Sequence, residues 1–314
     1  DYRKLIKFGE SSHVISLPAS WIRKNNLKKG DHIYFEENGN NELVITAEIK
    51  KFEPKQQEIT IDIDGKDLNL IRRELISAYL NDYSTIKVKG NNLKNIAASV
   101  RQEIQNLMAL EIIEQSEDMI TTKDFLNVED ISISELIRKM DIIVRSMLLS
   151  LKGSLNENKF PTISNMDMDI NRLFFAVLRT MKRCFANPAI IHSMKLDYLK
   201  LFQFWNIAYY LESMGDHIKW FSKNMNAKEI NGKVKKNTAS LIDDLEKYYL
   251  TTVKTFYNGD IEAAYKASLT KRGLMRKCDE IRSISGNNPT AVCVSENIKG
   301  IIEDVHSIVR RVYS

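Results

Sequence analysis

The 314-residue chain exceeds one ordinary core, and with 43% hydrophobic and 28% charged residues it is expected to fold into two or three globular units. A formal net charge of +5 is too small over this length to indicate nucleic-acid binding by itself, so the position of the charge matters more than its sum. No apolar run approaches the roughly 20 residues of a membrane span, no signal-peptide pattern is present, and three widely spaced cysteines indicate neither a disulfide framework nor a zinc site, so a cytoplasmic protein is expected.

Positive charge is concentrated in the first 30 residues. Seven basic side chains stand there against two acidic ones, and residues 31 to 48 then carry five carboxylates and no Lys or Arg. Short apolar runs separated by turn residues predict strands at 5–8, 14–17, 33–35 and 43–45, and only ASWIRKNNL, after Pro18, has the pattern of one or two helical turns. So small a unit, with few large apolar side chains, is expected to gain stability by dimerising.

Strand and helix patterns alternate between about 57 and 126. In chain order they are EITIDID as a strand, LNLIRRELISAYLND as a helix, TIKVK as a strand, LKNIAASVRQEIQNLMA as a helix, and EIIEQ and MITTK as strands. This order predicts a small α/β unit, for which no motif indicates a role.

Helical periodicity continues from residue 132 to the end of the chain. Breaks near 153–162, 187–188, 226–232, 258–259 and 286–289 delimit six helices. The third and sixth helices each carry one apolar seam at spacings of three and four. We therefore expect a mainly α, multidomain protein: a β domain at 1–50, an α/β unit at 51–128, and a helical domain at 129–314 made of two related three-helix bundles, 129–228 and 229–314.

The run RKLIKFGESSHVISLPASWIRKNNLKKGDHIYFEENGNNELVI resembles the SpoVT/AbrB family of swapped-hairpin DNA-binding domains. The marks are a basic first strand, a Gly turn, the VISLP strand, a short basic helix, the LKKGD turn and a final strand pair. The resemblance implies that two chains interleave their hairpins into a homodimer that presents basic side chains to DNA. The residues implied to face DNA are Arg3, Lys4, Lys7, Ser11, Ser12, His13, Arg23 and Lys24. The alternative is a toxin-binding or purely dimerising hairpin whose Lys and Arg side chains are solvated.

Two carboxylates stand out on the third helix, within YYLESMGDHIKW. At 100° per residue, Glu212 and Asp216 fall opposite the apolar seam and are expected to point out of the bundle. Carboxylates four residues apart repel one another, which favours a bound cation or a basic partner. Their oxygen atoms suit Mg²⁺, Mn²⁺ or iron ions, and the alternative is a solvated face paired with Lys219 or Lys223.

The E-x-x-x-D pattern within two three-helix bundles resembles the PhoU family over roughly residues 132 to 314. The resemblance implies metal ions at the bundle surface, held here by Glu212 and Asp216. Asp167 and Asp169 are further candidate ligands, although Ser164 and Asp167 form a capping-box pattern that favours a role in capping the second helix. In the second half the pattern is broken, since Lys299 replaces the Glu, and Lys299 with Glu303 is expected to form an ion pair.

The expected function follows from the two resemblances together. Without a Gly-rich phosphate loop before a helix or a metalloprotease His spacing, no catalysis is expected. The leading hypothesis is a DNA-binding regulator of phosphate uptake, with phosphate transporter components or a sensor kinase as protein partners. One alternative is a metal-binding bundle whose hairpin only dimerises, and another is a transporter adaptor that does not bind DNA.

Overall fold

The structure is a computed structural model that describes residues 2–37, 43–47, 57–126, 131–225, 230–286 and 288–314. Contacts divide the chain into two compact units, residues 1–54 and 55–314, which are described separately. The boundaries expected from the sequence at 50/51, 128/129 and 228/229 lie outside the described residues.

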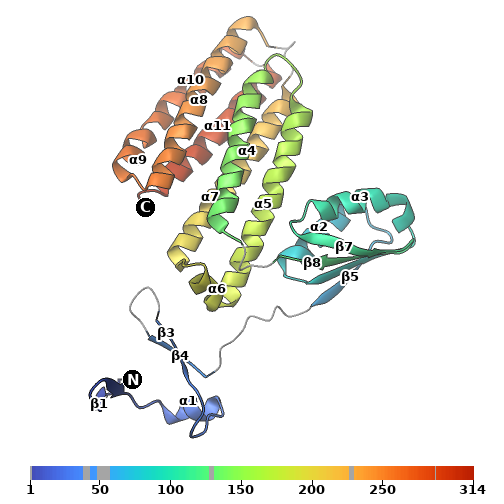
Figure 1. The fold of residues 1–314 in the computed structure, drawn as a ribbon. Helices are drawn as coiled ribbons and strands as arrows, with labels where there is room; N and C mark the ends of the chain where they lie inside the picture. Colours follow the sequence, from blue (N-terminus) through green and yellow to red (C-terminus); the bar gives the residue numbers. More distant parts are fainter. Residues whose placement is uncertain (1, 38–42, 48–56, 127–130, 226–229, 287) are drawn as a thin grey trace. The chain divides into compact units, whose positions relative to one another are not determined.

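The first unit consists of two hairpins and a short helix, as Figure 1 shows. Strands β1 (Ile6–Phe8) and β2 (Ser12–Val14) pair antiparallel, as do β3 (Tyr34–Glu37) and β4 (Leu43–Thr46), and α1 spans Ala19–Lys24. The expectation of a second strand at 14–17 is wrong. Gly9 has a φ of 73°, which permits a three-residue turn that returns the chain at once, so that Ser12 already lies opposite Phe8.

No buried core forms within the described part of this unit. None of its side chains is buried, and Phe8, Phe35 and Leu43 are 69%, 59% and 59% exposed. The two hairpins form separate two-stranded sheets. An isolated two-stranded hairpin is marginally stable at best in water, so the apolar side chains of this unit require another surface to cover them.

The α/β part of the second unit follows the order expected from the sequence. Its elements are β5 (Glu58–Asp62), α2 (Leu68–Leu80), β6 (Thr85–Lys89), α3 (Leu93–Gln105), β7 (Leu110–Gln115) and β8 (Met119–Asp124). The strands form one mixed sheet in the order β5-β6-β8-β7, in which β5 and β6 are parallel and the other pairs antiparallel. Helices α2 and α3 bury Ile71, Leu75 and Val100 against Ile86 and Ile120 of the sheet.

Eight helices are described in the rest of the chain. They are α4 (Ile133–Gly153), α5 (Phe160–Ala186), α6 (Pro188–Ser193), α7 (Tyr198–Asn224), α8 (Gly232–Asn258), α9 (Ile261–Ser268), α10 (Thr270–Ser285) and α11 (Pro289–Arg310). The expected count of six misses α6, which is too short to show periodicity, and joins α9 to α10. Leu269 between these two keeps helical dihedral angles, so the apolar pattern continues across the junction. Of the helices described, none is long and apolar enough to cross a membrane.

Helix α7 lies at the centre of the helical part. It packs against α4, α5 and α11, while α11 packs against α8, α9 and α10, so that α7 and α11 join an earlier and a later group of helices (Figure 1). The apolar seams predicted on both helices are confirmed by burial. The buried seam residues are Leu201, Phe204, Ile207, Leu211, Met214, Ile218 and Phe221 on α7 and Val294, Ile298, Ile301, Val305 and Ile308 on α11.

A buried ion network joins the α/β part to the helical part. Arg179 of α5 is fully buried and donates to Asp124 at 2.7 Å and to Asp82 at 3.1 Å. Arg183, one helical turn later, donates to the same two carboxylates. The guanidinium carbon of Arg179 lies 4.3 Å from the ring centre of Tyr79, a cation–π contact. Two cations thus neutralise two carboxylates, of which Asp124 is 5% and Asp82 32% exposed, and no local sequence pattern indicates this network.

We expect Arg179→Ala to lower the free energy of unfolding by about 3 kcal/mol, because the variant leaves two carboxylates with one cation, Arg183, and removes a fully buried side chain. Urea unfolding at neutral pH measures the change. Arg172→Ala is the control: Arg172 is exposed on the same helix, and its loss should stay within about 0.5 kcal/mol. Equal free energies of unfolding for the two variants would show that the ion network does not stabilise the fold.

Candidate functional site

The first hairpin has a polar and an apolar face. Lys7 lies directly opposite His13, so the two share one face, whereas Ile6 with Val14 and Phe8 with Ser12 share the other. Two of the residues implied to face DNA, Lys7 and His13, are therefore brought together. Ser12 is not among them, because alternation along the strand places it beside the apolar side chains.

The other residues implied to face DNA lie outside the paired strands. Arg3 and Lys4 precede β1, Ser11 belongs to the turn, and Arg23 and Lys24 form the last turn of α1; all five are exposed. Within the part of the chain that the structure describes, Lys4, Lys7, Arg23 and Lys24 form no ion pair. Their cationic groups are therefore available to a polyanion without first breaking an internal contact.

On α7, the acidic pair does not simply point into solvent as the helical wheel predicts. Glu212 is partly buried and interacts electrostatically with carboxylates of two neighbouring helices, Asp167 of α5 and Asp304 of α11. Burial raises the pKa of Glu212 to about 7, and the charges of Asp216 and Asp167 add to the increase. The prediction failed because α7 is flanked on two sides, so a position outside its apolar seam still faces neighbours.

Lys219 supplies the cation that this acidic pair favours. Its Nζ lies 2.6 Å from an oxygen of Asp167 and 2.9 Å from an oxygen of Asp216. The partner expected from the sequence as an alternative to a metal is therefore present. Lys223, the other candidate, instead lies over the ring of Trp220, 4.7 Å from its centre.

The expected cap at the start of the second helix is wrong. Helix α5 begins at Phe160, with Pro in its first turn, so Asp167 and Asp169 lie about two turns inside it. Two residues apart on a helix, these side chains point about 200° apart. Asp167 is buried against Lys219, whereas Asp169 is exposed, so Asp167 and not Asp169 joins the acidic face of α7.

The second helical group contributes one buried carboxylate, which the sequence analysis did not identify. Asp304 of α11 lies 4.0 Å from the imidazole of His217, and burial raises its pKa to about 7. Its burial could have been predicted from the sequence, since Asp304 stands three residues after Ile301 and so falls beside the apolar seam of α11. The expected Lys299–Glu303 pair is wrong: Lys299 contacts Asp279 and Glu296, and Glu303 contacts Lys271, because partners on α10 lie within reach of both.

Metal binding through Glu212, Asp216 and Asp169 stays a prediction. Among the residues that the structure describes, no group of three or more His, Cys, Asp or Glu side chains is arranged to hold a metal ion. The position between Asp167 and Asp216 is taken by the ammonium group of Lys219, so a metal there would have to displace it.

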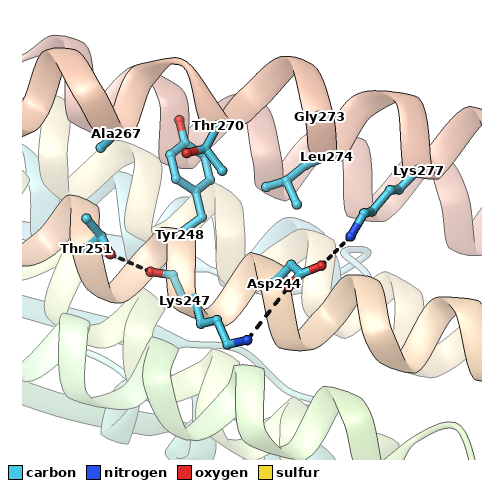
Figure 2. A pocket seen from close by; sticks show the side chains of 9 residues that line it. All are labelled: Asp244, Lys247, Tyr248, Thr251, Ala267, Thr270, Gly273, Leu274 and Lys277. Atoms are coloured by element: carbon cyan, nitrogen blue, oxygen red, sulfur yellow. Dashed lines mark hydrogen bonds and ion pairs between the residues drawn. The ribbon is translucent and has the colours of Figure 1, made fainter.

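A groove of about 410 Å³ runs between α8 and α10. Figure 2 shows Lys277 of α10 directed across the groove toward Asp244 of α8, and Lys247 of the same helix α8 directed toward Asp244 as well, with Nζ–oxygen distances of 2.5 and 3.8 Å. Ala267 and Leu274 form part of an apolar floor. The volume of the groove lies at the low end for ligand sites. Its charged groups, one aspartate and two lysines, are largely paired with one another, which leaves one net positive charge.

The raised pKa of Glu212 predicts how stability depends on pH. A carboxyl with a higher pKa in the folded than in the unfolded state holds its proton longer when folded, so stability falls as pH rises from about 4.5 to about 7 and stays lower above. We expect Glu212→Gln to match the parent at pH 4.5 and to exceed it by about 1–2 kcal/mol at pH 8, after allowance for partial exposure. Urea unfolding at both pH values measures this, with Asp169→Asn as an exposed control. A difference independent of pH would refute the assignment.

Comparison with known proteins concerns the N-terminal part only. Residues 6–60 match the family model of MazE, described as antidote-toxin recognition MazE, bacterial antitoxin. No curated protein and no solved structure shows significant similarity to the chain. The match spans both hairpins and the start of β5, and it does not extend into the helical part. The chain therefore carries, at its N-terminus, a small β domain similar to the MazE and AbrB type.

Proposed function

We propose that this protein is a DNA-binding regulator that acts as a homodimer through its N-terminal hairpins. The observation that carries the proposal is the division of the first hairpin into an apolar face, with Ile6, Phe8 and Val14, and a polar face with Lys7 and His13. A second copy can cover the apolar face, and DNA phosphates can bind the other.

The need for a second copy follows from the missing core. The N-terminal unit has no buried side chain among its described residues, yet its apolar side chains alternate as they do in folded sheets. Interleaving with a second copy would bury those side chains without any further segment of the chain. The match to MazE and the resemblance to AbrB domains both support this arrangement.

The cations of this unit suit a phosphate backbone. Lys4, Lys7, Arg23 and Lys24 are exposed and form no ion pair with any described residue, so each is free to release counterions from DNA. Dimerisation would double their number within one surface. Arg23 and Lys24 extend from the last turn of a short helix, from which long side chains can reach a groove or the backbone.

For the helical part we propose regulation of phosphate uptake, by docking to transporter components or to a sensor kinase. This finer proposal is supported by the resemblance of residues 132 to 314 to the PhoU family. It is also supported by the paired helical groups that meet at α7 and α11, and by the acidic face of α7 with Glu212 and Asp216. The ion network of Arg179 connects that part rigidly to the α/β part, which precedes it in the chain.

We expect Lys7→Ala with Lys24→Ala to weaken DNA binding and to reduce the slope of log affinity against log salt by about 1.8, since each lost phosphate contact accounts for about 0.9. Fluorescence anisotropy with duplex DNA at several salt concentrations measures both effects. The matched control is Lys233→Ala with Lys236→Ala, which removes the same charge from exposed positions of α8. An unchanged slope in the first variant would rule out the interface proposed.

We expect Ile6→Ser with Phe8→Ser to shift the protein toward monomer, because both changes remove apolar surface from the face that the second copy would cover. Sedimentation equilibrium gives the dissociation constant, and its increase should be tenfold or more. Leu250→Ser with Ile284→Ser serves as the control, since both residues are exposed on the helical part. If the hairpin variant has the same dimer dissociation constant as the control, dimerisation through the N-terminal unit, residues 1–54, which we call the head, is contradicted.

The same measurements separate the alternative that the MazE match offers. A hairpin that recognises a protein, as the description of that family states for its own members, would dimerise normally and bind DNA with no dependence on Lys7 and Lys24. That outcome would replace DNA binding by protein recognition as the function of the head.

A further inference from the structure

A row of aromatic side chains runs along the outer side of α7. We call Tyr198, Phe202, Trp205 and Tyr209 the aromatic stripe. Phe202 and Trp205 have ring centres 6.0 Å apart, and Trp205 and Tyr209 have centres 6.1 Å apart. Tyr198, Phe202 and Tyr209 are each about half exposed, at 51%, 47% and 47%. Exposed single hydrophobic residues are common on proteins, but a row of aromatic side chains along one face of a helix, three of which contact one another in sequence, indicates an interaction surface.

The stripe is exposed because α7 extends beyond its neighbour α11. Gly300 lies against His217, and Asp304 lies near His217 and Ser213, so α11 runs antiparallel to α7. In that register the last residue of α11, Arg310, is roughly level with Ile207. The first turns of α7, which carry most of the stripe, therefore have no α11 beside them.

The spacing of the stripe identifies its partner. Its residues follow one another at intervals of four, three and four, which read the same from either end. We propose that the stripe binds the same stripe of a second copy of this chain, with the two α7 helices antiparallel around a two-fold axis between Phe202 and Trp205. Tyr198 then lies opposite Tyr209 of the second copy, and Phe202 opposite Trp205 of the second copy, so every layer joins two aromatic rings.

Charge at the ends of the stripe agrees with this register. Lys195, exposed one turn before α7, is placed near Glu212 of the second copy, and the two-fold axis repeats the pair. A parallel arrangement would instead put each Glu212 near the other and each Lys195 near the other. The complementary ends therefore favour the antiparallel dimer.

The available area suits an interface that needs support. An aromatic side chain covers about 200 Å² in full, so half-exposed rings contribute on the order of 100 Å² each. With Phe185, which stacks on Tyr198 and is 57% exposed, the contact would bury about 500 Å² per copy, or about 1,000 Å² in total. That is the lower end for specific interfaces. The proposed N-terminal dimer would raise the effective concentration of the two stripes, although the stripe contact does not depend on it.

Distances between spin labels in the full-length protein test the arrangement. Single cysteines at Gln203 and, separately, at Lys223 carry the labels, with the partly exposed Cys293 changed to Ser. The two labels at Gln203 lie level with the axis, on the sides of the two helices away from the contact, and should be roughly 30 Å apart or less. Those at Lys223 are separated by about 39 helical residues and should be about 60 Å apart. Two short distances, or no defined distance at Gln203, would overturn the proposal.

Substitutions then assign the short distance to the stripe. Tyr198→Glu with Phe202→Glu should abolish it, whereas Trp220→Ser, which removes an equally exposed aromatic from the same helix, should leave it unchanged. Circular dichroism establishes that each variant remains helical. Persistence of the short distance in the first variant, or its loss in the second, overturns the assignment.

Charge reversal tests the register, and the hairpin variant separates the two dimer contacts. Lys195→Glu should reduce the fraction of short distances at least threefold, and Glu212→Lys in the same chain should restore it; no recovery overturns the register.

In Ile6→Ser with Phe8→Ser, the short distance should return at high protein concentration even when the head no longer dimerises. Failure of the head alone thus leaves the stripe contact intact, and failure of the stripe alone leaves the DNA-binding dimer intact.

Discussion

The buried pairing of Arg179 and Arg183 with Asp82 and Asp124 determines how the second unit is built. Charges largely removed from water are tolerated only when their partners are correctly placed, so these ion pairs form in few arrangements of the sheet against α5. Apolar packing alone would allow the α/β part to shift over the helix. The network therefore makes one body of two hydrophobic cores, and a displacement of α5 would be felt at the end of β8 and in the turn after α2.

The N-terminal unit follows the opposite principle. Its strands pair only within two-stranded hairpins and, among the described residues, leave their side chains unburied, so another surface is needed to cover them. This division between the two units suits the function proposed above. A rigid body with its own cores can hold a docking or sensing surface, while a head completed by a second copy becomes competent for a two-fold symmetric target only when assembled.

Local pattern predicted the elements well, and tertiary contacts explain most of the failures. Alternation and helical periodicity gave the order of the α/β part and the seams of α7 and α11, because each of those signals lies within about 20 residues. The partners of Arg179 are 97 and 55 residues away, so no local pattern could identify them. Lys299 and Glu303 have the right spacing for an ion pair, yet nearer partners on α10 take both. At α5, Pro161 was the better signal for the helix start than the Ser164 and Asp167 pattern.

The contact between Gly300 and His217 fixes the position of α7 along α11. The imidazole occupies the space where any side chain at position 300 would begin, and the positions one turn before and after it on the same face of α11, Asn297 and Asp304, do carry side chains. The ring is thus held in a notch on α11, with a larger residue on either side of it. Such a notch resists sliding of α7 along α11 while it opposes rotation much less. Relative motion of the two helical groups is therefore expected to be a pivoting about this point and not a change of register.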